Sequence, residues 1–255
     1  MQVITIINQK GGVGKTTTAH NLSVALEAKD KKVLTIDLDP QCNLSWIYNQ
    51  PSELTIYDVL QEPVKIKDAI QQSSQGAFIN SSEMLAIYPT LSLDRKNFRL
   101  KDALANVKEL YDIVIIDTPP SLSAITLNAL IASDYALVTA QADQFSLNGV
   151  KQLHETIQAV IESDNKHLSL LGFIITRFNP RSKIRANFLN NFEQLANLID
   201  SKVYATKIRE STAIAEAQSR KMNIFDFKNG SSNGAKDYQA LCDEIAIDLG
   251  FNYDF

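Results

Sequence analysis

The sequence lacks the features that mark several common classes of protein. Its 255 residues include only two cysteines, Cys42 and Cys242, and neither belongs to a Cys-x-x-Cys or Cys/His cluster. A disulfide framework or a metal site built on cysteine is therefore not expected, and a reducing compartment fits best. No apolar run approaches the roughly 20 residues of a membrane helix, and the N-terminus has no basic segment followed by a long apolar one. We expect a cytoplasmic protein without a membrane partner.

Positive charge is not in excess either. The chain has 25 Lys and Arg residues against 29 Asp and Glu residues, a net charge of −4. This balance argues against a protein that binds nucleic acid over its whole surface. Residues 177–221 nevertheless contain nine basic and four acidic residues. Such a segment can contact phosphate backbones without reading bases, although a solvated face of mixed charge explains the composition as well. The candidate DNA contacts are Arg181, Lys183, Arg185, Lys207, Arg209, Arg220 and Lys221.

Short apolar runs alternate with longer amphipathic segments along the whole chain. Most of the short runs are apolar on both faces, as parallel strands covered on two sides must be. The expected strands are residues 3–8, 32–39, 84–89, 112–117, 135–142, 170–177 and 203–208. The expected helices are residues 15–29, 98–111, 123–133, 146–162, 183–199, 211–219 and 235–249. Residues 50–82 and 229–234 are expected to form helical turns and loops. The alternation predicts one α/β domain over residues 1–255, with a doubly wound, mostly parallel sheet and helices on both faces.

One glycine-rich stretch, NQKGGVGKTTTAHN at residues 8–21, lies between an expected strand and an expected helix. Glycines let backbone N–H groups close around phosphate oxygens, and the N-terminus of the helix favours negative charge. The Lys15 ammonium would reach the β- and γ-phosphates, and the Thr16 hydroxyl would bind Mg²⁺. The stretch departs from the usual phosphate loop, because Gln9 replaces a glycine and Lys10 adds a second cation. The expected nucleotide contacts in the loop are Gly11, Gly12, Val13, Gly14, Lys15, Thr16 and Thr17.

Aspartates at two other strand ends supply the carboxylates that a magnesium–phosphate site requires. Asp117 ends the run at residues 112–117, as a Walker-B aspartate does, and we expect it to hold the metal through water. Asp37 and Asp39 end the run at residues 32–39 and point to the same side of the strand. Two such carboxylates would repel each other without a cation. For Asp39 alone, a cap or an Asp-Pro turn is the alternative.

The sequence gives some indication of which nucleotide base is bound. A guanine site of the Ras type would use an Asn-Lys-x-Asp motif. The nearest match, NKHL at residues 165–168, ends in leucine and follows an expected helix instead of a strand. ATP is therefore preferred over GTP, with Mg²⁺ as its metal.

Three motifs together resemble a known family. KGGVGKTT (residues 10–17), DLDPQCN (residues 37–43) and DIVIIDTPPS (residues 112–121) are similar to the deviant Walker-A ATPases, specifically the ParA (Soj-like) partition ATPases. The resemblance covers nearly the full length and extends to residues 141–153 and 208–227. It implies a slow ATPase that binds nonspecific double-stranded DNA as an ATP-bound homodimer on the nucleoid. A ParB-like centromere-binding partner would stimulate hydrolysis and so dissolve the dimer.

The resemblance also implies roles for individual residues. Lys10 would reach across a nucleotide-sandwich dimer to the phosphates held by the other subunit, a cation comparable to an arginine finger. Asp39 would position the attacking water, while Asp37 and Asp117 would support magnesium. Lys10, Lys15 and Asp39 are thus the expected catalytic residues, with Thr16, Asp37 and Asp117 at the metal. Arg177 and Ile208 are the further nucleotide contacts that the resemblance implies.

The chain departs from this family at two positions. Cys42 stands where glycine is common, a small-for-small change. Arg209 stands where proline is common, in a loop that lies near the adenine in relatives. The chain also begins at the phosphate-loop strand, so we expect no N-terminal helix-turn-helix and no sequence-specific DNA recognition.

Other functions fit the residues less well. A membrane-cycling regulator resembling MinD would end in a basic amphipathic helix, whereas residues 243–255, DEIAIDLGFNYDF, are acidic and would be repelled by anionic lipid. An electron-transfer iron protein would need cysteines that bridge a cluster between subunits, and Cys42 and Cys242 do not fit. A non-catalytic, ATP-gated scaffold remains open.

Overall fold

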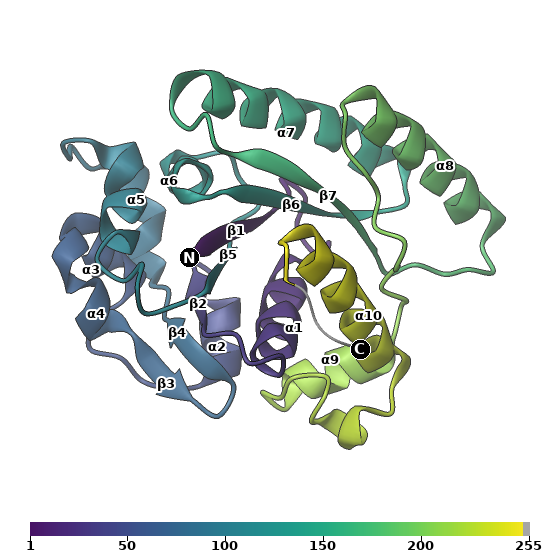
Figure 1. The fold of residues 1–255 in the computed structure, drawn as a ribbon, viewed down its shortest axis with the longest axis horizontal. Coiled ribbons are helices and arrows are strands. Elements are labelled where there is room, and N and C mark those ends of the chain that lie inside the picture. The colour runs from purple at the N-terminus through teal and green to yellow at the C-terminus, as the bar shows by residue number, and fades with distance from the viewer. Residues whose placement is uncertain (252–255) are drawn as a thin grey trace.

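The computed structural model describes residues 1–251, except for the side chains of Phe145 and Asn148. Within this part, one seven-stranded sheet has the order β3-β4-β2-β5-β1-β6-β7 (Figure 1). The strands are β1 (Gln2–Ile7), β2 (Val33–Asp37), β3 (Gln71–Ser73), β4 (Gly76–Ile79), β5 (Ile113–Asp117), β6 (Tyr135–Gln141) and β7 (Ser169–Thr176). Only the β3–β4 pair is antiparallel among these neighbours. The predicted single α/β domain with a mostly parallel sheet is confirmed.

Helices cover both faces of this sheet (Figure 1). The α-helices are α1 (Lys15–Glu27), α2 (Asn43–Tyr48), α3 (Ile56–Gln61), α4 (Ile66–Ala69), α5 (Arg99–Leu104), α6 (Ala124–Ala132), α7 (Gln144–Ser163), α8 (Lys183–Leu198), α9 (Thr212–Ser219) and α10 (Asn233–Asp248). Short 3₁₀-helices are η1 (Pro63–Lys65), η2 (Glu83–Thr90), η3 (Lys96–Phe98) and η4 (Phe227–Gly230). Among residues 1–251, no helix combines the length and the apolar character that crossing a bilayer requires.

Strand β1 shows why both faces are covered. Ile4 and Ile6 pack into the core with α1 and α10, whereas Val3 packs on the opposite face with α5 and α6. Ile7 continues that second face toward α7 and α8. Because side chains alternate along a strand, a strand with apolar residues on both faces needs a layer on each side. The two layers hold the sheet rigid and leave the carboxyl ends of its strands to carry the site.

The strand predicted at residues 84–89 is wrong, because this segment forms the 3₁₀-helix η2. The Ser82 side chain accepts a hydrogen bond from Met84 N and so caps the helix. Leu85 and Tyr88 are both fully buried, and their three-residue spacing matches the three residues per turn of a 3₁₀-helix. The strands at this edge, β3 and β4, instead lie at residues 71–79, inside the region predicted to be loops and turns.

Two other segments differ from the prediction. The helix expected at residues 98–111 ends at Leu104, where the Asn106 side chain donates to the carbonyls of Asp102 and Ala103 and competes with the helical hydrogen bonds. Residues 203–208 run beside β7 but make only isolated bridges. The N–H groups of residues 205 and 206 donate instead to Glu244 of α10. The last four residues of the acidic C-terminal segment, 252–255, lie outside the described residues.

Candidate active site

The glycine-rich loop joins the carboxyl end of β1 to the first turn of α1, as predicted. Gly12 and Gly14 have φ values of 73° and 85°, a left-handed conformation that glycine adopts without a steric penalty. Gly14 is the N-cap of α1. The loop therefore lies at a helix N-terminus, where backbone N–H groups and the helix dipole favour an anion such as phosphate.

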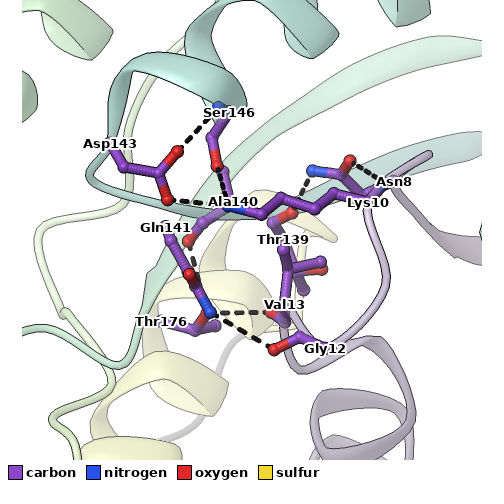
Figure 2. A network of polar contacts seen from close by, with 10 residues as sticks. All are labelled: Asn8, Lys10, Gly12, Val13, Thr139, Ala140, Gln141, Asp143, Ser146 and Thr176. Carbon is purple, nitrogen blue, oxygen red and sulfur yellow. Dashed lines mark hydrogen bonds and ion pairs between the residues drawn. The ribbon is translucent and has the colours of Figure 1, made fainter.

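Side chains from β6, which pairs with β1, and from β7, the next strand along, hold this loop in place (Figure 2). Gln141, at the end of β6, donates from Nε2 to Gly12 O at 3.2 Å. Thr176, at the end of β7, donates from Oγ1 to Val13 O at 2.8 Å. Both contacts engage carbonyl oxygens of the loop and so fix its conformation.

Three predicted residues meet where β2 and β5 end beside α1. Asp37 and Asp117 are partners in the parallel pairing of these strands, and both are almost fully buried. The Thr16 hydroxyl donates to Asp117 Oδ2 at 2.6 Å, while Asp117 Oδ1 is buried without a hydrogen-bond partner. An unpartnered carboxylate oxygen in this position is costly unless a cation or an ordered water meets it.

Asp37 is more fully engaged than Asp117. Its Oδ1 accepts from Asp39 N at 3.0 Å, and its Oδ2 accepts from Ser45 N at 2.8 Å and from Ser45 Oγ at 2.7 Å. These contacts fix the turn that carries Asp39 and the start of α2. Asp39 Oδ1 in turn accepts from Gln41 N at 3.0 Å. Asp37 is therefore better suited to shape this turn and to meet a metal through water than to bind it directly.

Burial shifts the pKa of the charged groups around the loop. It raises the pKa of Asp37 to about 6 and raises the pKa of Asp117 well above its ordinary value, with repulsion from Asp37 adding to the effect. Burial also lowers the pKa of the Lys15 ammonium, against the attraction of Asp117 and Asp39. All three shifts arise because charges are held away from water. A divalent cation would favour the ionised form of both carboxylates.

The donors present fit a magnesium ion that arrives with phosphate. Among the described residues, no group of three or more His, Cys, Asp or Glu side chains is placed to hold a metal. Mg²⁺, however, commonly binds through one or two protein oxygens together with substrate phosphates and water. The Thr16 hydroxyl and the unpartnered oxygen of Asp117 supply such a set. Binding of the metal would therefore depend on a bound nucleotide.

A cleft of about 700 Å³ opens at the loop, a volume within the usual range for a small-molecule site. The predicted residues that line it are Gly11, Gly12, Gly14, Lys15, Thr16, Thr17, Asp39, Arg177, Ile208 and Arg209. Lining residues that the sequence analysis did not single out include Gln41, Asn43, Trp46, Pro120, Thr176, Gln218 and Tyr238. Most of the predicted phosphate-site residues are thus brought together at one cleft.

Lys10 is the exception among the predicted catalytic residues. It is not one of the described residues that line the cleft of its own chain. Its side chain extends toward the start of α7, where Nζ forms an ion pair with Asp143 Oδ2 at 2.8 Å (Figure 2). Val13 also lies outside the lining, because its side chain is fully buried.

Arg209 has a different environment from the one predicted for a DNA contact. Its guanidinium donates to both carboxylate oxygens of Asp237, at distances between 2.6 and 3.1 Å, and its backbone N–H donates to the same carboxylate at 2.9 Å. Asp237 is buried on α10, next to the cleft residue Tyr238. This ion pair ties the loop after Ile208 to α10 and so fixes one wall of the cleft.

The other candidate DNA contacts lie in three places. Arg181 and Lys183 are exposed, with Arg185 half-buried beside them, at the start of α8. Lys207 donates to the carbonyls of Tyr204 and Ala205 within its own segment.

Lys221 and Arg220 lie against aromatic rings. Lys221 donates to Asn49 Oδ1 and lies 4.8 Å from the centre of the Trp46 ring. Arg220 is exposed and lies over the Phe227 ring. Lys207, Arg209 and Lys221 therefore have partners within the chain, whereas the start of α8 presents its charge to solvent.

The sequence analysis did not single out three residues that contact the phosphate loop or Lys10. Gln141, Asp143 and Thr176 are the polar residues at the carboxyl ends of β6 and β7, where apolar strands turn into loops. Since β6 runs parallel to β1 and pairs with it directly, its end must lie beside the phosphate loop. Only the strand order, which the sequence does not supply, makes this inference possible.

Comparisons with known proteins agree with this geometry. A family model described as an AAA domain (AAA_31) matches residues 1–170. The sporulation initiation inhibitor protein Soj of Bacillus subtilis is 35% identical over 255 residues, covering 96% of this chain and 98% of the relative.

Two solved structures have the same fold over nearly the whole chain. The ATP complex of a McdA variant from Cyanothece superposes with a TM-score of 0.87 at 26% identity, covering 100% of this chain and 98% of that one. Cobyrinic acid a,c-diamide synthase from Mycobacterium smegmatis, with a bound ATP analogue and magnesium, superposes with a TM-score of 0.83 at 28% identity, covering 98% and 96%. The chain belongs to the ParA/Soj family of partition ATPases, whose cofactors are ATP and magnesium.

Proposed function

We propose that residues 1–255 act as one ATP-driven switch for DNA partition. In this proposal Mg-ATP binding drives a nucleotide-sandwich homodimer that binds nonspecific double-stranded DNA on the nucleoid. A ParB-like, centromere-binding partner then stimulates hydrolysis, which separates the subunits and releases the DNA. The relatives named chromosome-partitioning proteins support this proposal at the level of the family.

The observation that carries the proposal is the position of Lys10. The cleft already contains Lys15 beside the phosphate loop, whereas the Lys10 ammonium lies outside the cleft of its own chain. A cation that belongs to the loop but faces away from its own cleft is suited to a nucleotide held by a second copy. Such an arrangement makes dimerisation depend on ATP, because each subunit then supplies charge that the other subunit's nucleotide requires.

The chain's own residues account for hydrolysis within one cleft. Lys15 and the loop N–H groups bind the phosphates, and Thr16 with Asp117 holds the metal. Magnesium supplies charge that stabilises the phosphoryl group during transfer. Asp39 lies at the cleft with its Oδ1 fixed by Gln41 N, which orients the carboxylate to position a water for attack. This is a role for orientation and hydrogen bonding more than for strong base catalysis.

The start of α8 is the best-supported contact for DNA. Arg181 and Lys183 are exposed there, and Arg185 lies one turn along. Lys and Arg side chains that reach phosphate oxygens give weak, salt-sensitive binding without sequence preference. A dimer would present this surface twice, which raises the overall affinity steeply without any new contact.

Fluorescence anisotropy with an arbitrary-sequence DNA duplex tests the proposal. The measurement compares ATP, ADP and no nucleotide at two salt concentrations. We expect binding only with ATP and magnesium, weaker at the higher salt, and lost in Lys10→Ala. Binding that is equal in all three nucleotide conditions, or absent in all of them, contradicts a nucleotide-gated DNA carrier. A parallel test on anionic liposomes would detect a membrane-cycling protein of the MinD kind.

A further inference from the structure

The side chain of Lys10 is held by a specific set of partners in its own chain. Lys10 Nζ pairs with Asp143 Oδ2 at 2.8 Å and lies 3.5 Å from Ser146 Oγ (Figure 2). Its backbone N–H donates to Asn8 Oδ1 at 2.8 Å, and Asn8 Nδ2 donates to Thr139 O at 2.6 Å. Both the main chain and the ammonium of Lys10 are thus anchored toward β6 and α7, away from the cleft.

The topology of the sheet explains why Asp143 meets Lys10. Strands β1 and β6 are parallel neighbours in which Ile7 pairs with Val138. Three residues beyond Ile7 comes Lys10, and the chain leaving β6 reaches Asp143 at the same edge of the sheet. The contact is therefore built into the strand order and does not depend on a flexible surface encounter.

Asp143 has a second function that fixes its geometry. It is the N-cap of α7, and its Oδ1 accepts from Ser146 N at 2.8 Å. One carboxylate oxygen thus caps the helix while the other holds the ammonium. Burial raises the pKa of this carboxyl, but the hydrogen bonds from Lys10 and Ser146 outweigh it and leave the pKa below its ordinary value. Asp143 is therefore a fixed negative charge at neutral pH.

We propose that Asp143 is a positioning residue that competes with nucleotide phosphates for Lys10 and so opposes formation of the ATP-bound dimer. This inference rests on the proposed function, in which Lys10 serves the partner's cleft. Lys10 cannot bind Asp143 at 2.8 Å and also reach across an interface to another chain. Each subunit must break its own ion pair for the dimer to form, so two ion pairs are lost per dimer.

The expected size of the effect follows from the exposure of the pair. The side chains are 36% and 32% exposed, and partly exposed ion pairs are generally weak. Such a pair shifts an equilibrium by up to about fivefold, so the two pairs, which are independent, shift dimerisation by up to about 25-fold. A bias of this size disfavours dimerisation before ATP occupies the cleft, but it does not prevent dimerisation once ATP is bound.

Asp143→Asn separates the two functions of this side chain. Asparagine caps helices as well as aspartate does, so the start of α7 should be retained, while the charge that holds Lys10 is removed. Asp102→Asn is the matched control, because it removes a carboxylate from an exposed ion pair with Arg95, in α5 and remote from the phosphate loop. Melting temperatures without nucleotide check that both variants remain folded.

Sedimentation velocity of the full chain, with a non-hydrolysable ATP analogue and magnesium, measures the dimer dissociation constant. We expect Asp143→Asn to dimerise about 2- to 25-fold more tightly than the wild type and Asp102→Asn to match the wild type. A merely structural role for Asp143 would weaken the dimer instead. If the wild type dimerises and Asp143→Asn dimerises equally tightly or more weakly, this result overturns the inference alone. A wild type that stays monomeric overturns the proposed function and the inference with it.

Discussion

Thr16 and Asp117 are joined by a hydrogen bond of 2.6 Å that links the first turn of α1 to the end of β5. The second oxygen of Asp117 is buried and has no hydrogen-bond partner. The phosphate loop and the carboxylate side of the site are therefore connected at one point, where a hydroxyl and a free carboxylate oxygen lie together. Magnesium bound here would be held by the loop and the sheet at once.

Asp117→Asn should uncouple magnesium from nucleotide binding. The amide keeps the shape of the side chain but removes the charge that favours the cation. We expect the rise in melting temperature that ATP produces to become independent of Mg²⁺, and hydrolysis to fall by about 10²-fold or more. Thr16→Ser retains the hydroxyl and is the control. An unchanged magnesium response in Asp117→Asn would remove this residue from the metal site.

The ion pair between Arg209 and Asp237 should contribute to stability. Asp237→Asn leaves the guanidinium facing a neutral group, and because the Arg209 side chain is 38% exposed, water can compensate in part. We expect the free energy of unfolding to fall by about 1–3 kcal/mol. Urea denaturation measures this change. Glu216→Gln, which breaks the exposed pair with Lys228, should change the same quantity by less than about 0.5 kcal/mol.

The same ion pair should also affect the cleft. Because Arg209 lines the cleft and Asp237 holds it there, Asp237→Asn should raise KM for ATP more than it lowers kcat. The opposite pattern, a large loss of kcat with an unchanged KM, would mean that the pair acts on the phosphate end of the site.

His20 should make stability depend on pH. It is fully buried in α1, its Nε2 lies 2.9 Å from Gln75 Oε1, and burial lowers its pKa to about 4. Between about pH 6.5 and pH 4 the unfolded chain therefore binds a proton that the folded chain does not. The contribution of His20 to stability is complete above about pH 6.5 and is lost as the pH falls through this window, up to about 3 kcal/mol.

The difference between the wild type and His20→Gln isolates this contribution. Asp37 titrates in the opposite sense, since its folded pKa is raised, but it is present in both proteins. We expect urea denaturation at about pH 7 and at about pH 5 to show a larger loss of stability in the wild type than in the variant. An equal loss in both proteins would mean that His20 is protonated in the folded state.

The sequence predicted the central strands and the phosphate loop well, because both depend on local patterns. A run of apolar residues that ends in an aspartate, as in β5, has few alternatives in a protein of this size. Residues 84–89 were misassigned because a short apolar pattern fits a strand and a 3₁₀-helix equally. In the structure the Ser82 cap and the burial of Tyr88 decide between them, and tertiary packing is not visible in the sequence.

In the site, too, local motifs were predictable from the sequence and contacts that depend on tertiary packing were not. Lys15, Thr16 and Asp39 were identified from motifs and line the cleft. The pairing of Arg209 with Asp237 was not foreseen, since it joins residues on two segments whose proximity depends on the packing of α10. Arg209 was accordingly assigned to DNA by its charge alone. Charge composition gives the number of charged side chains in a segment, but it does not show which of them form ion pairs within the fold.

The central claim is that hydrolysis resets a DNA-bound dimer, and release from DNA tests it most directly. Wild type and Asp39→Ala are loaded on a fluorescent duplex with Mg-ATP, then diluted into excess unlabelled DNA and ADP while anisotropy is followed. The account predicts that the wild type leaves the DNA at the rate of phosphate release, whereas Asp39→Ala binds ATP and DNA but remains bound far longer. Equal release of the two proteins, with hydrolysis abolished in the variant, would contradict the account.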